Sequence, residues 1–333
     1  MNPIRFSMGY FVVVLLFSLL LTIYSVWWSA LPWRHSIGTN TNIVINKRAI
    51  ATTFVNTVMP MTTPLVTLPE QSANFTDYVL KLRQDIIKHQ ALDPYFIPRD
   101  HKVNPYNYSF LIDGREICQG DPPFLLIVVP SVFDHQEERW VIRETWGSVT
   151  KIGQWADGTK LPVIKLMFLF GMTSNKNIFG KLENESMEYG DVVLADFVDS
   201  YKNLTIKSMS ALYWTIRYCP DAKYLLKNDE DTIVHLPRLL HVLNKSSTNS
   251  VFGFARQGAR VFRGKVFKWG VSKEEYPGDV YPPYIYGNHY IIPNNLIGKL
   301  FYLSEYIPYL SMEDVFITVC LERVSCTCIK PLT

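Results

Sequence analysis

From Asp121 onward, continuous apolar runs of strand length alternate with stretches of helical character. The runs predicted as strands are Phe124–Val132, Leu161–Gly171, Asp191–Phe197 and Ala222–Asp229. The stretches predicted as helices are His135–Gly147, a polar stretch that ends at Tyr189, and Leu204–Cys219. Strands that are apolar throughout and separated by helices are typical of a mainly parallel sheet covered on both faces. The pattern therefore predicts an α/β fold, in which ligands bind beyond the carboxyl ends of the strands.

The N-terminal region has a different pattern, because no charged residue occurs from Met8 to Ala30. In a helix these residues would reach about 34 Å, enough to cross a bilayer core of about 30 Å. A cleaved signal peptide is the alternative, but the run is long for one, and Trp28 occupies a position that cleavage would reserve for a small residue. We therefore expect a cytosolic tail at 1–7 and a transmembrane anchor at 8–30.

Residues 31–117 resemble a stem between the anchor and a catalytic domain predicted at 118–333. The stretch Gly38–Ser72 is rich in Thr, Asn and Pro and shows no sustained periodicity, as is typical of a linker. A short amphipathic helix is predicted at Phe75–Gln90, with Tyr78, Leu82 and Ile86 on one face.

Five glycosylation acceptor triplets follow the predicted span, and together they favour a lumenal location for the rest of the chain. They begin at Asn74, Asn107, Asn184, Asn203 and Asn244. Basic residues flank the span on both sides, so charge does not settle its orientation.

Composition excludes some classes of function. The net charge is +3, so no basic excess indicates nucleic acid as a partner. The five cysteines lack the repeated spacing of a zinc site. Their odd number leaves one unpaired within the chain, and proximity suggests a bond from Cys320 to Cys326 or Cys328.

Three acids follow the fourth predicted strand directly: Asp229, Glu230 and Asp231. In an extended chain Asp229 and Asp231 would face one side and Glu230 the other. Adjacent carboxylates repel one another, so a bound cation would stabilise the cluster. Two hard oxygen ligands suit Mn²⁺ or Mg²⁺, with water and diphosphate oxygens in the remaining positions. A solvated acidic turn is the alternative.

A second acidic pair, Glu313 and Asp314, begins a predicted helix whose Val315, Val319 and Cys320 would pack inward. The helix dipole favours acids in a first turn, so a purely structural role is one interpretation. The other is catalytic, because a carboxylate beside an acceptor hydroxyl can remove its proton as that oxygen attacks a sugar.

Six segments, taken together and in order, resemble the β-1,3-glycosyltransferase family, which includes β-1,3-galactosyl- and N-acetylglucosaminyltransferases. They cover nearly all of the chain after the predicted stem. The matching segments are Arg139–Gly147, Phe168–Gly171, Glu188–Ser208, Arg217–Asp231, Tyr281–Ile292 and Glu313–Cys320.

The resemblance implies a GT-A type nucleotide-sugar-binding fold in a single-pass type II protein of the Golgi membrane, with its catalytic domain in the lumen. It also implies β-1,3 transfer of galactose or N-acetylglucosamine, with inversion, from a UDP-sugar to a glycan acceptor on a glycoprotein or glycolipid. The implied cofactor is Mn²⁺, with Mg²⁺ as the alternative.

By position, the resemblance places Asp229 and Asp231 at the metal and Asp314 as the catalytic base. The resemblance also implies nucleotide-sugar contacts from Arg139, Arg143, Asp199, Lys207 and Glu230, and acceptor contacts from Tyr284, Gly287 and Glu313. Instead of contacting the nucleotide, the two arginines have the alternative interpretation of surface charges. For Lys207 the alternative to a phosphate contact is a structural salt bridge.

The chain departs from the family pattern at Glu230, His289 and Thr318, where Asp, a small residue and Gly are usual. It also ends soon after the last matching segment, before a position at which some relatives have a further metal-binding His. A catalytically weak or inactive family member that acts as a glycan-binding or chaperone-like Golgi protein is therefore the alternative function.

Overall fold

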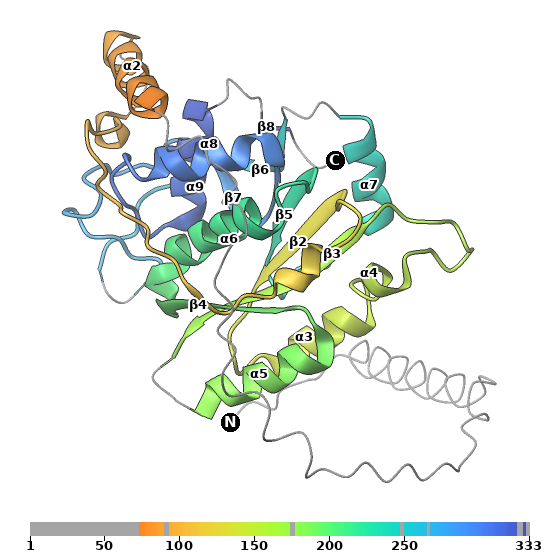
Figure 1. The fold of residues 1–333 in the computed structure, drawn as a ribbon. Coiled ribbons are helices and arrows are strands. Elements are labelled where there is room, and N and C mark those ends of the chain that lie inside the picture. The colour runs from red at the N-terminus through yellow and green to blue at the C-terminus, as the bar shows by residue number, and fades with distance from the viewer. Residues whose placement is uncertain are drawn as a thin grey trace, which may run out of the picture. The chain divides into compact units, whose positions relative to one another are not determined.

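The eight strands of the described chain form a single mixed sheet in the order β1-β4-β3-β2-β5-β7-β6-β8 (Figure 1). The computed structural model describes residues 73–89, 93–173, 177–246, 250–264, 267–324 and 329–330. The strands are β1 (Phe110–Ile112), β2 (Leu125–Pro130), β3 (Ile164–Met172), β4 (Val192–Val198), β5 (Tyr224–Asn228), β6 (Val251–Arg256), β7 (Tyr284–Pro293) and β8 (Ile329–Lys330).

Strands β4, β3, β2 and β5 are parallel, as the alternation of strands and helices predicts. The prediction of a mainly parallel sheet holds for these four strands, and β8 also runs parallel to β6. Strand β7 runs antiparallel to both β5 and β6, and β1 runs antiparallel to β4. The central β5 therefore joins a parallel half to a half that contains both orientations.

Strand β2 shows how the sheet separates two hydrophobic cores. Its side chains point alternately to opposite faces. Leu126 and Val128 belong to one buried cluster, whereas Leu125, Ile127 and Val129 belong to the other. A strand buried on both faces requires apolar residues at every position, which explains the unbroken apolar run in the sequence.

Helices cover both faces of the sheet (Figure 1). Helices α6, α8 and α9 contribute to the first cluster, and helices α3, α5 and α7 contribute to the second. The helices are α2 (Ala73–His89), α3 (Gln136–Glu144), α4 (Val149–Ile152), α5 (Asn177–Tyr189), α6 (Leu204–Tyr218), α7 (Leu236–Asn244), α8 (Asn294–Ser304) and α9 (Glu313–Val324), with short 3-10 turns η2 (Pro94–Phe96), η3 (Arg115–Cys118) and η4 (Tyr201–Asn203).

Part of the segment expected to form a stem packs on this body. Strand β1 joins the sheet beside β4, and Phe96 of η2 is fully buried. The predicted amphipathic helix exists as α2, but its buried face includes Val79, while Tyr78 is exposed. Residues 93–117 therefore belong to the folded unit, because their apolar side chains complete the first core cluster.

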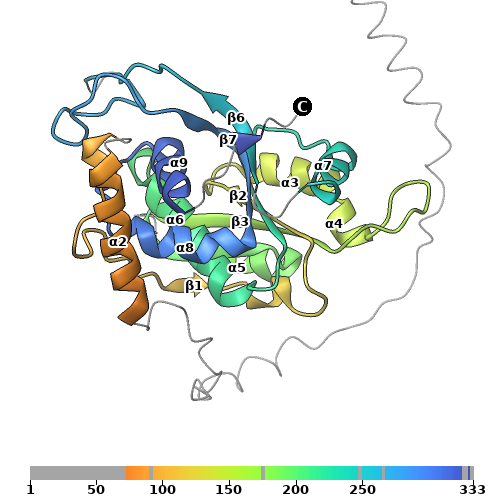
Figure 2. The same cartoon turned by 90° about the horizontal axis from the view of Figure 1, so that it is seen from above.

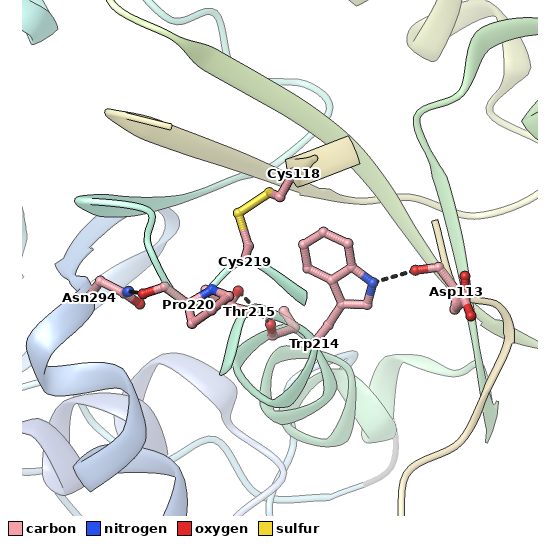
Figure 3. Close-up of a disulfide and its surroundings, with 8 residues drawn as sticks. Asp113, Cys118, Trp214, Thr215, Cys219, Pro220 and Asn294 are labelled. Atoms are coloured by element: carbon pink, nitrogen blue, oxygen red, sulfur yellow. Dashed lines mark hydrogen bonds between the residues drawn. A yellow bond between two sulfur atoms is a disulfide. The ribbon is translucent and has the colours of Figure 1, made fainter. Parts of the chain in front are cut away.

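A disulfide joins Cys118 at the end of η3 to Cys219 at the end of α6 (Figure 3). Beside it, the indole Nε1 of Trp214 donates a 2.6 Å hydrogen bond to the Asp113 carbonyl. Cys320 is a buried free thiol, so the predicted bond from Cys320 to Cys326 or Cys328 is wrong. Its position on the inward face of α9 explains this, since the side chain points into the core.

The predicted anchor and the tail before it lie outside the described residues. Within the described part of the chain, no helix combines the length and apolar character needed to cross a bilayer.

Candidate active site

The acidic residues after β5 form a tight turn held by the side chain of Asn228. Its amide nitrogen donates hydrogen bonds of 2.8 Å to the carbonyls of both Asp229 and Thr232. The Asp229 N–H donates to the Asn288 carbonyl of β7 at 2.9 Å. Asn228 is fully buried, so it fixes the turn against the end of the sheet.

The three carboxylates of this turn point to different partners. The Asp229 carboxylate forms an ion pair with Lys227, with 2.5 Å between Oδ1 and Nζ. Glu230 turns toward the start of α3, where it accepts a 2.8 Å hydrogen bond from Ser131 and pairs with His135. The hydrogen bond to Glu230 raises the pKa of His135. Asp231 is exposed. Glu230 and Asp229 therefore have different partners, but the extended conformation expected here is wrong, because the Thr232 N–H donates to the Asp229 carbonyl at 3.1 Å and closes a turn.

The second acidic pair lies in the first turn of α9. Glu313 is buried, and its Oε1 accepts hydrogen bonds from the Ser208 hydroxyl, at 2.9 Å, and from the Tyr290 hydroxyl. Burial raises the pKa of Glu313. These contacts attach α9 to α6 and β7, so Glu313 holds the helix in place and Asp314 projects beside it.

The surroundings of Asp314 strongly shift the pKa of its carboxyl group. Burial, and then the neighbouring charge of Glu313, raise its pKa from 3.8 to about 7. The Val315 N–H, which donates to Oδ1 at 2.9 Å, and the charge of Lys227 act in the opposite direction. A carboxyl group that titrates near neutrality is suited to accept and release a proton.

Gly287 allows β7 to approach the acids closely. A Cβ at this position would lie 3.2 Å from the Asp314 Cβ, 3.3 Å from Asp314 Oδ2 and 3.3 Å from Glu313 Oε2. These separations are shorter than ordinary van der Waals contacts. A side chain at this position would therefore force the two carboxylates to shift by a few tenths of an ångström.

Lys227 connects the turn after β5 to the start of α9. Its Nζ pairs with Asp229 and donates to the Gly287 carbonyl. Burial alone would lower the pKa of Lys227, but the carboxylates of Glu313 and Asp229 raise it above its ordinary value. The structure thus brings together Asp229, Asp314, Glu313 and Gly287, which are distant in the sequence.

Arg139 and Arg143 are not placed where the sequence analysis expected them. Both are buried, and their guanidinium groups pair with Glu185 and Asp191 at 2.7 Å. They pack over Phe170 and Phe168 of β3, respectively. The predicted nucleotide contact is therefore replaced by a structural role, because the donor groups are directed into the protein. Arg139 also donates to the Ser131 hydroxyl at 3.1 Å, which in turn reaches Glu230.

Lys207 and Asp199 form the structural salt bridge that was the alternative interpretation. The Lys207 Nζ lies 2.6 Å from Asp199 Oδ2 and 2.7 Å from the Ser131 carbonyl. Asp199 also accepts the Gly171 N–H at 3.1 Å. Burial lowers the pKa of Lys207, although Asp199 opposes that effect. The pair joins the ends of β2, β3 and β4 beside the acidic turn.

The residues that depart from the family pattern have defined partners. The Thr318 hydroxyl accepts the Ile285 N–H at 2.9 Å and donates to the Asp314 carbonyl at 2.8 Å, so it joins α9 to β7. His289 contacts Asn228 Oδ1 at 2.5 Å, and burial lowers its pKa. A neutral His289 donates from Nδ1 to Asn228. The predicted acceptor residue Tyr284 is buried beneath this region.

A cavity of about 240 Å³ lies next to the acidic turn. Residues from Thr232 to Val242 line it together with His289, and most of the lining is apolar. The cavity therefore adjoins the residues that the sequence predicts to bind a metal ion.

Asp229 and Asp231 are the residues available to hold Mn²⁺ or Mg²⁺. In the described part of the chain, no group of three or more His, Cys, Asp or Glu side chains is arranged to hold a metal ion. A pair of carboxylates nevertheless fits such an ion, which commonly takes its other oxygen ligands from water and substrate phosphates. Asp229 and Asp231 would therefore supply two oxygen ligands to such an ion, and binding of the ion stays a prediction.

The predicted glycosylation acceptors differ in accessibility. Asn107, Asn184 and Asn244 are exposed, the last two on helices. Asn203 is half-buried, and its amide donates to the Val198 carbonyl at 2.7 Å. The side chain of Asn74 lies outside the described residues. Modification of these positions remains a prediction.

Residues 137–331 match a family model described as galactosyltransferase. The chain belongs to this family. It is 36% identical over 236 residues to β-1,3-galactosyltransferase 5 of Gorilla gorilla gorilla, covering 68% of this chain and 77% of that protein. It is 35% identical to the Homo sapiens protein of the same name, over 68% of this chain and 74% of that one.

β-1,3-Galactosyltransferase 1 of Mus musculus is 31% identical, over 68% of each chain. The predicted resemblance to the β-1,3-glycosyltransferase family is therefore confirmed, and this galactosyltransferase-family chain is a glycosyltransferase. Its mixed α/β architecture fits the predicted GT-A type fold. The apo structure of the bifunctional glycosyltransferase WbbM aligns with a TM-score of 0.32 and 12% identity, over 61% of this chain and 38% of that one, which is too low to bear on function.

Proposed function

We propose that this protein transfers galactose from UDP-galactose to a hydroxyl group of a glycan acceptor, in β-1,3 linkage and with inversion at the anomeric carbon. The names of the relatives favour galactose over N-acetylglucosamine. The observation that carries the proposal is the position of Asp314, whose pKa is raised to about 7 beside the acidic turn.

Asp314 is the general base of the proposed reaction. Its Oδ1 accepts the Val315 N–H, and the Gly287 backbone also hydrogen-bonds to the carboxylate, so the group is held in place. A carboxylate has about four acceptor sites, so it retains lone pairs for the acceptor proton. As the acceptor oxygen attacks the anomeric carbon, its proton passes to Asp314 and the bond from that carbon to the diphosphate oxygen breaks. A pKa near the working pH keeps much of the carboxylate ionised while it remains basic enough to accept the proton.

The residues of the acidic turn have complementary roles. Asp229 and Asp231 would hold Mn²⁺ or Mg²⁺, which supplies electrostatic stabilisation of the charge on a departing diphosphate. Glu230 and Asn228 hold the turn in position through Ser131 and the backbone carbonyls. Lys227 balances part of the negative charge between Asp229 and Glu313.

The protein is proposed to work in the Golgi lumen, on an anchor at 8–30 with a cytosolic tail at 1–7. The uncharged run Met8–Ala30 supports the anchor. The disulfide between Cys118 and Cys219 supports an oxidising compartment. The exposed acceptor asparagines Asn107, Asn184 and Asn244 agree with a lumenal body.

The proposal is tested with the full-length chain in detergent, a panel of UDP-sugars, Mn²⁺ and β-linked glycan acceptors. We expect galactosyl transfer from UDP-galactose. We expect Asp314→Asn to retain UDP binding by calorimetry and to lose transfer by about 10²- to 10⁴-fold, because the base is absent while the donor site is intact. Wild-type protein that binds UDP but galactosylates no acceptor would instead indicate the glycan-binding or chaperone-like alternative.

A further inference from the structure

Exposed aromatic side chains come from three separate segments, namely η4, the connection between β6 and β7, and β7. Between 38% and 46% of each residue's surface is accessible. This aromatic rim comprises Tyr201, Phe262, Phe267, Trp269 and Tyr286. Figure 2 shows the connection between β6 and β7, which carries three of the five, extending beyond the sheet on the side of α9. Exposed apolar side chains that form one contiguous patch commonly mark a binding surface.

The rim is held together by its own contacts. The ring centroid of Phe262 lies 5.3 Å from that of Phe267 and 5.9 Å from that of Trp269. Lys202 of η4 donates to the Gly270 carbonyl. The Lys268 Nζ lies 4.5 Å from the centre of the Tyr201 ring. The segment 267–270 is therefore held against η4.

The rim is continuous with the catalytic residues. Burial raises the pKa of Tyr201, and the carboxylates of Asp314 and Asp229 add to that effect, which places this phenol within the field of both acids. Tyr286 directly precedes Gly287, whose backbone lies beside Asp314. A glycan whose terminal sugar reaches Asp314 would extend over the rim.

The same surface has an excess of positive charge. No Asp or Glu occurs between Asp231 and Glu274 in the sequence. Arg263 and Lys273 pair with Asp279. Arg256, Arg260 and Lys268 are exposed, and none of them forms an ion pair with a carboxylate of the described residues. These three cations are therefore available to an anionic ligand.

We propose that the aromatic rim, Lys268 and Arg256 form an acceptor subsite for an acidic sugar, carboxylated or sulfated, next to the sugar that receives galactose. The inference rests on the proposed function. A pyranose ring presents C–H groups on one face, which pack against an aromatic ring. The acid group would pair with Lys268, and with Arg256 on the side of Tyr286, where its guanidinium lies 6.0 Å from the ring centre.

The alternative role for these cations is to bind the donor diphosphate, and steady-state kinetics separates the two. The acceptors are three disaccharide methyl glycosides with a terminal N-acetylglucosamine: one with neutral galactose as the second sugar, one with 6-sulfated galactose and one with glucuronic acid. In the wild type we expect KM for at least one acidic acceptor to be about five- to tenfold below that of the neutral one. The advantage should shrink at high salt.

Lys268→Gln should raise KM for the acidic acceptors to the neutral value and leave kcat and KM for UDP-galactose unchanged. Trp269→Ala should raise KM for all three acceptors. Lys273→Gln is the matched control, because Lys273 is paired with Asp279 on the same connection. Equal KM values for neutral and acidic acceptors in the wild type would overturn the proposal, as would an effect of Lys268→Gln on KM for UDP-galactose alone.

Failure of the proposed function gives a different result, namely no transfer to any of the three acceptors. In that case calorimetric titration of the same disaccharides into wild-type protein and Lys268→Gln decides the inference. Tighter binding of an acidic disaccharide that is lost in the variant supports the subsite, and equal binding of all three disaccharides contradicts it.

Discussion

Two clusters of charged side chains lie on opposite faces of the sheet and differ in charge balance. In the first, Arg139 and Arg143 pair with Glu185 and Asp191, so two positive groups meet two negative groups. Every member is buried. The arginines hold the pKa of Glu185 below its ordinary value, although burial alone would raise it. This balanced cluster joins α3, α5 and β3.

In the second cluster a single lysine among the described residues, Lys227, faces Asp229, Glu313 and Asp314. Burial, and then the neighbouring charge of Glu313, raise the pKa of Asp314 to about 7. Both clusters combine basic side chains with Asp and Glu, but the first uses arginine and the second lysine. The difference teaches that burial raises the pKa of a carboxyl group unless enough positive charge compensates for it, as it does at Glu185 and not at Asp314.

The largest expected effect comes from removing the carboxylate of Asp231, which lies in the acidic turn next to the second cluster. We expect Asp231→Ala to reduce UDP-galactose turnover by at least about a thousandfold, because half of the proposed metal-binding pair is lost. The measurement is product formation at limiting Mn²⁺. Asp157→Ala, which removes an exposed acid from another loop, should retain turnover. Normal turnover of Asp231→Ala under these conditions would refute the metal assignment.

The next effect concerns the balanced cluster. Arg143→Met removes the arginine that pairs with Asp191 and one of the two donors to Glu185 Oε1, and breaking a buried ion pair in this way costs about 3–5 kcal/mol of unfolding free energy. Urea unfolding followed by circular dichroism measures the loss. Arg217→Met is the control, since Arg217 is exposed on α6. Unchanged stability with weakened UDP affinity would restore the nucleotide role that the sequence suggested.

A smaller effect tests the contact between β7 and the acids. Gly287→Ala places a methyl group about 3.2–3.3 Å from Asp314 and Glu313, so the carboxylates must shift by a few tenths of an ångström. We expect kcat to fall about tenfold, equivalent to about 1.4 kcal/mol, with the fold retained. Gly298→Ala serves as the control, because no atom lies within 4 Å of a Cβ at that position. An unchanged kcat for Gly287→Ala would show that the close contact is dispensable.

Much of the parallel half could be predicted from the sequence. Strands β2, β3, β4 and β5 appear as unbroken apolar runs because they are buried on both faces. The acidic turn and the inward face of α9 follow from local pattern as well, and Val315, Val319 and Cys320 are buried as predicted.

The assembly of the site could not be predicted from local pattern. The approach of Gly287 to Asp314 depends on the antiparallel pairing of β7 with β5, between segments about sixty residues apart, and no periodicity encodes that register. Lys227 and Asn228 are polar residues in an otherwise apolar strand, and this pattern could have indicated that both belong to the site.

The arginines of α3 illustrate the opposite error. Arg139 and Arg143 share the buried face of the helix with Ile142, a spacing that indicates packing against the sheet. Their charge suggested a ligand, but their partners Glu185 and Asp191 lie more than forty residues away in the sequence. Helical spacing was therefore a better guide to the role of these residues than charge.

The most direct test of the central claim, that Asp314 is the base of galactosyl transfer, is the pH dependence of kcat/KM at saturating divalent ion. Asp314 must be ionised to accept a proton, and its raised pKa means that it becomes protonated as pH falls through about 7. The account predicts a plateau above pH 7, a tenfold loss per pH unit below it, and no such limb in Asp314→Asn. A profile that stays flat down to about pH 4, where an ordinary carboxyl group titrates, would contradict it.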